Sequence, residues 1–181
     1  MIRVVDSDQY GADLFPAPLT LAVAADVEYN SLRSGICYMT NADPGATGNF
    51  SNTFNITPWD PTASEAFIPG QVDITGSPNA EVSVSFVLPS RLYPTAGGTG
   101  HIDMAYDIRS ATWGDANGEG MVADRFFNPQ DGLVTPLTGS GTLTIWMGGN
   151  PCVSKDATDI TGVGTDLFTN EALVTAEYTG N

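Results

Sequence analysis

The sequence has very little positive charge. Only six residues are lysine or arginine, against 21 aspartates and glutamates, so the formal net charge is −15. Lys155 is the single lysine. A field of this sign repels phosphate, so we expect neither nucleic acid nor an anionic membrane as a partner. The same charge favours solubility and attracts cations.

Long apolar runs are also missing. No uninterrupted apolar stretch approaches the roughly 18 residues that a membrane helix needs, so we expect no membrane span. The opening MIRVVDSDQY lacks the apolar core of a signal peptide. Two interpretations stay open: a signal was removed upstream of this numbering, or the protein never had one, as in a virion.

Signatures of catalysis are absent as well. The sequence contains no G-x-S-x-G elbow, H-E-x-x-H helix, phosphate-binding loop or dinucleotide fingerprint. The single histidine, His101, lies on the outward phase of its segment beside Asp103, where a surface role is the simpler interpretation. We therefore expect a protein that is not an enzyme.

Cysteine is scarce, since Cys37 and Cys152 are the only two. Two cysteines do not form a zinc site by themselves. If they pair, they close a long loop, to which chain entropy assigns roughly 4–5 kcal/mol, and they imply an oxidising compartment. We expect the disulfide, with two buried free thiols as the alternative.

What the sequence does contain is a series of segments in which apolar and polar residues alternate, as in half-buried β-strands. The clearest cover residues 81–88, 101–109, 142–147 and 172–178, and shorter candidates lie at 2–5, 19–29, 54–56 and 72–74. Glycine- and proline-rich turns separate them. The pattern predicts an all-β fold, an antiparallel β-sandwich of immunoglobulin-like or jelly-roll-like type. We expect residues 1–15 to form an N-terminal strand or arm and residues 16–181 to form the sandwich.

The alternation also predicts which side chains face the core. In 101–109 the inward series ends with Tyr106 and Ile108. In 142–147 it contains Leu143, Ile145 and Met147, which leaves Trp146 on the polar, exposed phase.

One loop resembles the start of a calcium site. Asp115, Asn117 and Glu119 supply oxygen at alternate positions before a glycine, as in a calcium-binding loop. The acid expected at the end of such a loop is replaced by Phe126, and Asp124 is the nearby substitute. Calcium is thus the one candidate ion, and the alternative is a polar loop without one.

Three tryptophans are candidates for a glycan-binding platform or a subunit interface: Trp59, Trp113 and Trp146. Exposed aromatic rings stack on sugars and are enriched in protein interfaces. The alternative is packing over the end of the sandwich. Glycosylation sequons at Asn49 and Asn55 indicate an exposed region around them.

The N-terminus carries a short strand-like piece in which Ile2, Val4 and Val5 are the candidate subunit-contact residues. The polar stretch Asp6–Asp13 separates it from the next strand. An isolated strand pairs either with its own sheet edge or with the edge of a neighbour. Addition to a neighbour is head-to-tail and generates filaments when it does not close.

Three groups of residues resemble a family of bacterial secreted β-sandwich proteins of uncharacterised function, similar in style to pilus and fimbria subunits. They are Pro18-Leu-Thr-Leu with Asp26-Val-Glu-Tyr-Asn-Ser-Leu, then Phe67, Gly70, Val72, Ile74-Thr-Gly76, Val82 and Leu88-Pro89, and finally Asn170, Val174 and Tyr178. The chain departs from that pattern at Tyr29-Asn30, where the family has Phe-Gly.

The resemblance implies a secreted, cell-surface role and brings no catalytic residues. Together with the N-terminal strand it predicts a self-assembling filament, pilus-like or surface-layer subunit whose partners are copies of itself. The alternatives are a carbohydrate-binding or adhesive module and a viral coat or decoration protein.

Overall fold

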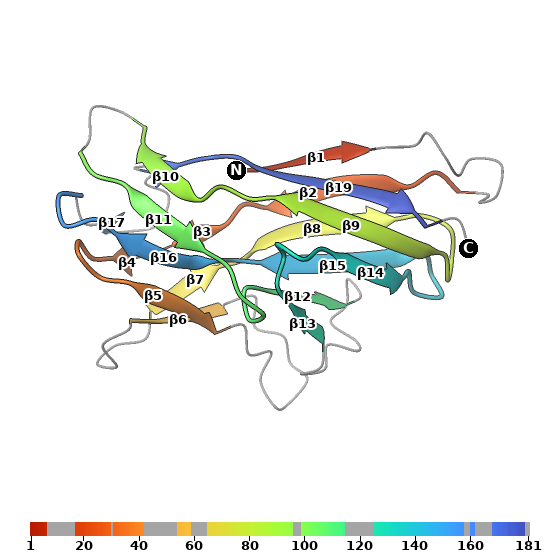
Figure 1. The fold of residues 1–181 in the computed structure, drawn as a ribbon. Coiled ribbons are helices and arrows are strands. Elements are labelled where there is room, and N and C mark those ends of the chain that lie inside the picture. Colours follow the sequence, from red (N-terminus) through yellow and green to blue (C-terminus); the bar gives the residue numbers. More distant parts are fainter. Residues whose placement is uncertain are drawn as a thin grey trace.

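The computed structural model describes residues 1–6, 17–29, 31–41, 54–58, 65–95, 99–114, 125–157, 160–161 and 168–179 (Figure 1). Its named elements in these ranges are all β-strands, so the predicted all-β fold is confirmed. None of the described residues belongs to a helix long and apolar enough to cross a membrane.

One half of the molecule is a two-layer sandwich. The first layer is a four-stranded sheet in the order β1 (Ile2–Asp6), β19 (Ala172–Tyr178), β9 (Glu81–Val87) and β14 (Leu133–Pro136). The second is a five-stranded sheet in the order β13 (Phe126–Phe127), β12 (Ala111–Gly114), β15 (Thr142–Met147), β8 (Gly70–Thr75) and β2 (Thr20–Ala25). Pairing within both sheets is antiparallel except between β1 and β19, which run parallel.

The main core lies between these two layers, and the period-two pattern explains it. Alternate residues of four strands meet there and are almost fully buried: Val72, Ile74, Val82, Val84, Leu143, Ile145, Val174 and Ala176. Burying a branched apolar side chain of this kind contributes roughly 1.5–3 kcal/mol. The predicted inward faces of 81–88, 142–147 and 172–178 are therefore confirmed.

Several strands bend and continue into a second half. The continuations are β3 (Glu28–Tyr29), β7 (Glu65–Ile68), β10 (Arg91–Pro94), β11 (Ile102–Ala105) and β16 (Asn150–Val153). The remaining strands are β4 (Ser31–Leu32), β5 (Tyr38–Asn41), β6 (Phe54–Pro58), β17 (Ile160–Thr161) and β18 (Phe168–Thr169).

The sheet orders change at the bends. In the second half the orders are β16-β11-β10-β18 and β3-β7-β6-β5, with β17 paired to β4. The β11–β16 pair therefore joins the extension of β9, whereas β12 and β15 belong to the opposite sheet. Strands that change sheets at a bend are a known way to turn a corner in a sandwich. A second apolar cluster fills this half: Leu32, Tyr38, Ile102, Trp146, Val153 and Ala157.

Two tyrosines hold the bends in place. Tyr29 donates a hydrogen bond from its hydroxyl to the carbonyl of Gly149, between β15 and β16, at 3.1 Å. Tyr106 donates to the carbonyl of Pro89, between β9 and β10, at 3.0 Å. Gly149 must lack a side chain, because a Cβ there would lie 2.8 Å from the ring of Tyr106 and from the methyl of Met104.

Two predicted side-chain positions are wrong. Trp146 is 3% exposed, because the end of β15 lies at the bend and the second apolar cluster covers its outer side. Ile108 is 64% exposed, because β11 ends at Ala105 and a turn closed by the Ser110 amide on the Asp107 carbonyl replaces the expected strand.

Candidate functional site

The candidate site is the edge of the sandwich at which β1 docks. Figure 1 shows β1 running beside β19, and the register pairs Ile2 with Ala172 and Val4 with Val174. β1 also packs alongside β2 in the opposite layer. The N-terminal strand therefore closes the gap between the last strand of one sheet and the edge strand of the other.

Alternation places Ile2 and Val4 on the inner side of β1. Ile2 is 6% exposed and belongs to the main core, and Val4 packs against that core. Arg3, between them, is exposed. Ile2 and Val4, two of the three predicted subunit-contact residues, thus pack into the core of their own domain. Val5 pairs through its backbone with Thr175, and its side chain lies outside the described part of the chain.

The receiving surface is shaped for Ile2. A Cβ on Gly70, at the start of β8, would overlap the terminal methyl of Ile2 and lie 2.9 Å from a methyl of Val27. The Ile2 amide donates a 2.7 Å hydrogen bond to Asp26 Oδ1. A glycine, a valine methyl and a carboxylate therefore define one end of the groove, by which we mean the space between β19 and β2 that β1 fills.

Ala17, at which the described chain resumes after β1, is held independently of β1. The Tyr178 hydroxyl donates to the Ala17 carbonyl at 2.8 Å and accepts from the Ser77 amide at 2.7 Å. The Ala17 amide donates to Ser77 Oγ at 3.1 Å. The attachment of Ala17 thus depends on β19 and the loop after β8, so it does not require β1.

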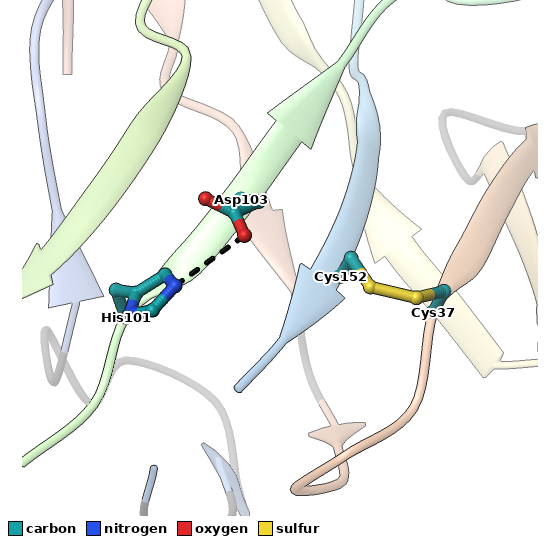
Figure 2. The surroundings of a disulfide bond; sticks show 4 residues. All are labelled: Cys37, His101, Asp103 and Cys152. Carbon is teal, nitrogen blue, oxygen red and sulfur yellow. Dashed lines mark ion pairs between the residues drawn. A yellow bond between two sulfur atoms is a disulfide. The ribbon is translucent and has the colours of Figure 1, made fainter. Parts of the chain in front are cut away.

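The predicted disulfide between Cys37 and Cys152 is present, and it spans 115 residues of sequence (Figure 2). Cys152 pairs with Asp103 across β16 and β11. Figure 2 shows Asp103 on β11, and His101 directly before that strand, with His101 Nε2 3.3 Å from Asp103 Oδ2.

Asp103 is already committed to a second partner. Arg91 donates a hydrogen bond from Nε to Asp103 Oδ1 at 2.7 Å, and this bond holds the pKa of the Asp103 carboxyl below its usual range. The nearby Ser154 hydroxyl accepts a hydrogen bond from the backbone amide of His101 at 2.9 Å. These contacts place the Arg91–Asp103 ion pair and the His101 ring together at the surface of the sheet.

The predicted calcium ligands Asp115, Asn117, Glu119 and Asp124 lie outside the described residues. Within the described ranges, no group of three or more His, Cys, Asp and Glu side chains is arranged to hold a metal ion. Calcium binding by the 115–124 loop therefore stays a prediction.

The three tryptophans do not gather into one exposed platform among the described residues. Trp59 lies outside those residues. Trp113 packs against the main core, and the Arg125 guanidinium lies 4.3 Å from its ring centre. Trp146 is buried and is not available for stacking on a sugar from solvent.

Sequence reasoning identified Ile2 and Val4 but missed what receives them. Gly70 follows Pro69 and entered the sequence analysis only as one residue of the motifs that resemble secreted sandwich proteins, with no role assigned to it. Asp26 and Val27 lie at a bend inside a segment that was predicted as one continuous strand. Their shared role depends on the sheet order, which a single sequence does not reveal.

Comparison with protein families, with curated proteins and with solved structures finds no match for this chain.

Proposed function

We propose that this protein is the structural subunit of an extracellular filament, pilus-like fibre or surface layer, in which copies join by exchanging β1. The supporting observation is the place of β1 in the fold. It is a terminal edge strand, yet its Ile2 and Val4 side chains complete the core between β19 and β2. A second copy's β1 fits the same groove with the same contacts.

Exchange of β1 between copies requires no contacts that the single domain does not already make. The contacts made by β1 within its own domain and in a neighbour are identical, so the balance depends on concentration and on the connecting segment. A tethered strand competes at an effective concentration of roughly millimolar. Dilute protein is therefore expected to hold its own strand, and open-ended assembly is expected at high local concentration.

The proposed location outside the cell is supported by the disulfide, because such bonds persist mainly in oxidising compartments. The acidic charge of −15 keeps free subunits apart and soluble before assembly. The similarity of the sequence motifs to secreted pilus-like sandwich proteins is consistent with the same location.

Peptide complementation tests the docking step. A variant that lacks residues 1–6 should bind a fluorescent peptide of residues 1–8, measured by anisotropy, whereas the intact chain should not. Ile2→Asp in the peptide should weaken binding at least about tenfold, since it places a charge in the core. Arg3→Ser, on the exposed side of the same strand, is the matched control and should bind normally.

If the shortened variant does not fold, a protease site inserted within residues 7–16 gives a second route. Cleavage leaves β1 docked without a covalent link, and the labelled peptide should then replace it over time. No replacement in the cleaved protein, together with no binding to the shortened one, would rule out exchange.

Assembly itself is tested on the intact chain. Concentrated protein should form oligomers that negative-stain microscopy resolves as fibres or sheets, and Ile2→Asp should prevent them. Particles that remain single subunits at every concentration and salt condition would contradict the proposed function. Fibres that form equally well with Ile2→Asp would show that assembly uses another surface.

A further inference from the structure

A cavity of about 350 Å³ lies at the junction of the two halves of the molecule. Apolar side chains from both halves line much of it: Leu88, Leu92, Ile102, Met104, Met147 and Phe168. We propose that this cavity is a binding site for a small uncharged apolar molecule, such as a medium-chain alcohol or a compound with one or two aromatic rings.

The size of the cavity supports an occupant of this kind. A dry apolar cavity of about 150 Å³ is enough to bind benzene, so this one takes a ligand of roughly twice that volume. Pockets that bind small molecules start at about 300 Å³. The lining of this cavity includes exposed residues such as Met1 and Thr169, so the space opens to solvent and a ligand can enter it.

Two tyrosine hydroxyls in the wall are engaged by the fold. The hydroxyls of Tyr29 and Tyr106, both lining residues, donate to the carbonyls of Gly149 and Pro89. Burial raises the pKa of both phenols, so they stay neutral. The rings thus present apolar faces to a ligand while their hydroxyls hold the bends.

The charges at the cavity favour a neutral ligand. Asp26 is the acidic side chain in the described lining, and the N-terminal ammonium of Met1, also at the lining, lies 4.0 Å from its Oδ1. An anionic ligand would have to compete with Asp26 for this ammonium, and the whole chain carries a net charge of −15. A neutral ligand needs no charged partner, so it is favoured over its anionic counterpart.

Methionine methyl groups provide the test. Met104 and Met147 line the cavity, whereas Met39 on β5 is 43% exposed and is not part of the lining. In protein labelled with carbon-13 at the methionine methyls, octan-1-ol should produce saturable shifts at Met104 and Met147 but not at Met39. Octanoate, with the same chain length and a carboxylate, should bind at least about tenfold more weakly.

A cavity-filling variant completes the test. Leu92→Trp should reduce octan-1-ol binding at least tenfold, and Val134→Trp, at a position 61% exposed on β14, should leave it unchanged. If Leu92→Trp disturbs folding, Thr169→Trp places the same ring at an exposed lining position.

Shifts that rise linearly without saturation, or that include Met39 equally, would overturn the proposal. If Leu92→Trp and Thr169→Trp both bind octan-1-ol as tightly as the unchanged protein, the proposal is overturned as well. Shifts that depend on protein concentration in the absence of alcohol would instead identify a second copy as the occupant and would also overturn it. Met1 and Ile2, at the start of the chain and of β1, also line the cavity, so every measurement uses dilute monomer that holds its own β1. Loss of octan-1-ol binding under these conditions overturns this proposal alone, because exchange of β1 is tested separately with the labelled peptide.

Discussion

Gly70 is the residue on which the seating of β1 depends most directly. Its missing side chain leaves the space that the terminal methyl of Ile2 occupies. We expect Gly70→Ala to push Ile2 outward and to lower the free energy of unfolding by about 1–3 kcal/mol, the usual cost of overpacking. Urea denaturation monitored by tryptophan fluorescence measures the loss.

A double-mutant cycle separates this contact from a general effect on β8. When Ile2→Ala has already removed the clashing methyl, Gly70→Ala should cost clearly less, because the two changes share one space. Gly139→Ala is the control, since a Cβ there meets nothing within 4 Å. Additive losses in the cycle would mean that Gly70 does not act through Ile2.

The strand elements were largely predictable, whereas the bends between them were not. Alternation in 81–88, 142–147 and 172–178 identified β9, β15 and β19 and their inward faces, because a period of two has one structural meaning in a half-buried sheet. The same rule failed at Trp146, where the outer side of β15 is covered by the second half. Alternation reports two faces, but it does not report what lies against each.

The tyrosines that hold the bends make the stability of these elements dependent on pH. Burial raises the pKa of Tyr106 in the folded protein, whereas tyrosines in the unfolded chain have a pKa of about 10. As the pH rises, the unfolded chain therefore loses this proton at a lower pH than the folded protein does. The contribution of Tyr106 is therefore complete below about pH 10 and is lost as the pH rises above it. Tyr106→Phe should lower stability by about 1–2 kcal/mol at neutral pH, because the Pro89 carbonyl loses its donor.

Between about pH 8 and about pH 11, the free energy of unfolding of Tyr106→Phe should also fall less steeply than that of the wild type. Urea denaturation across that range measures it. Tyr93→Phe is the matched control, because Tyr93 is 53% exposed and its replacement should change neither quantity. An alkaline decline in Tyr106→Phe as steep as in the wild type would show that other groups control it.

At the scale of the whole molecule, the sequence indicated a sandwich, a disulfide and a terminal strand. It did not indicate which edge receives that strand. The parallel pairing of β1 with β19 brings together residues from opposite ends of the chain. Local patterns carry no information about such a contact, since it follows from the order of strands in the sheet. The cavity was equally hidden, because its walls come from five or more separate segments.

The net charge of −15 leads to a last prediction about assembly. Copies of the chain repel one another at low salt, and about 0.1 M salt limits this repulsion to about 10 Å. Exchange between whole subunits should therefore accelerate as sodium chloride rises from about 0.05 M to about 0.5 M. Docking of the short peptide should change little, because its charged side chains, Arg3, Asp6 and Asp8, sum to only −1.

Fluorescence energy transfer between two labelled pools of subunits measures the first rate, and peptide anisotropy measures the second. Calcium and magnesium chloride at equal ionic strength extend the comparison. If the two salts accelerate subunit exchange equally, screening of charge is the cause. If the loop with Asp115, Asn117 and Glu119 binds calcium, calcium chloride should have the larger effect. If salt accelerates peptide docking as much as subunit exchange, the barrier lies in releasing the resident β1, and charge repulsion between subunits does not limit assembly.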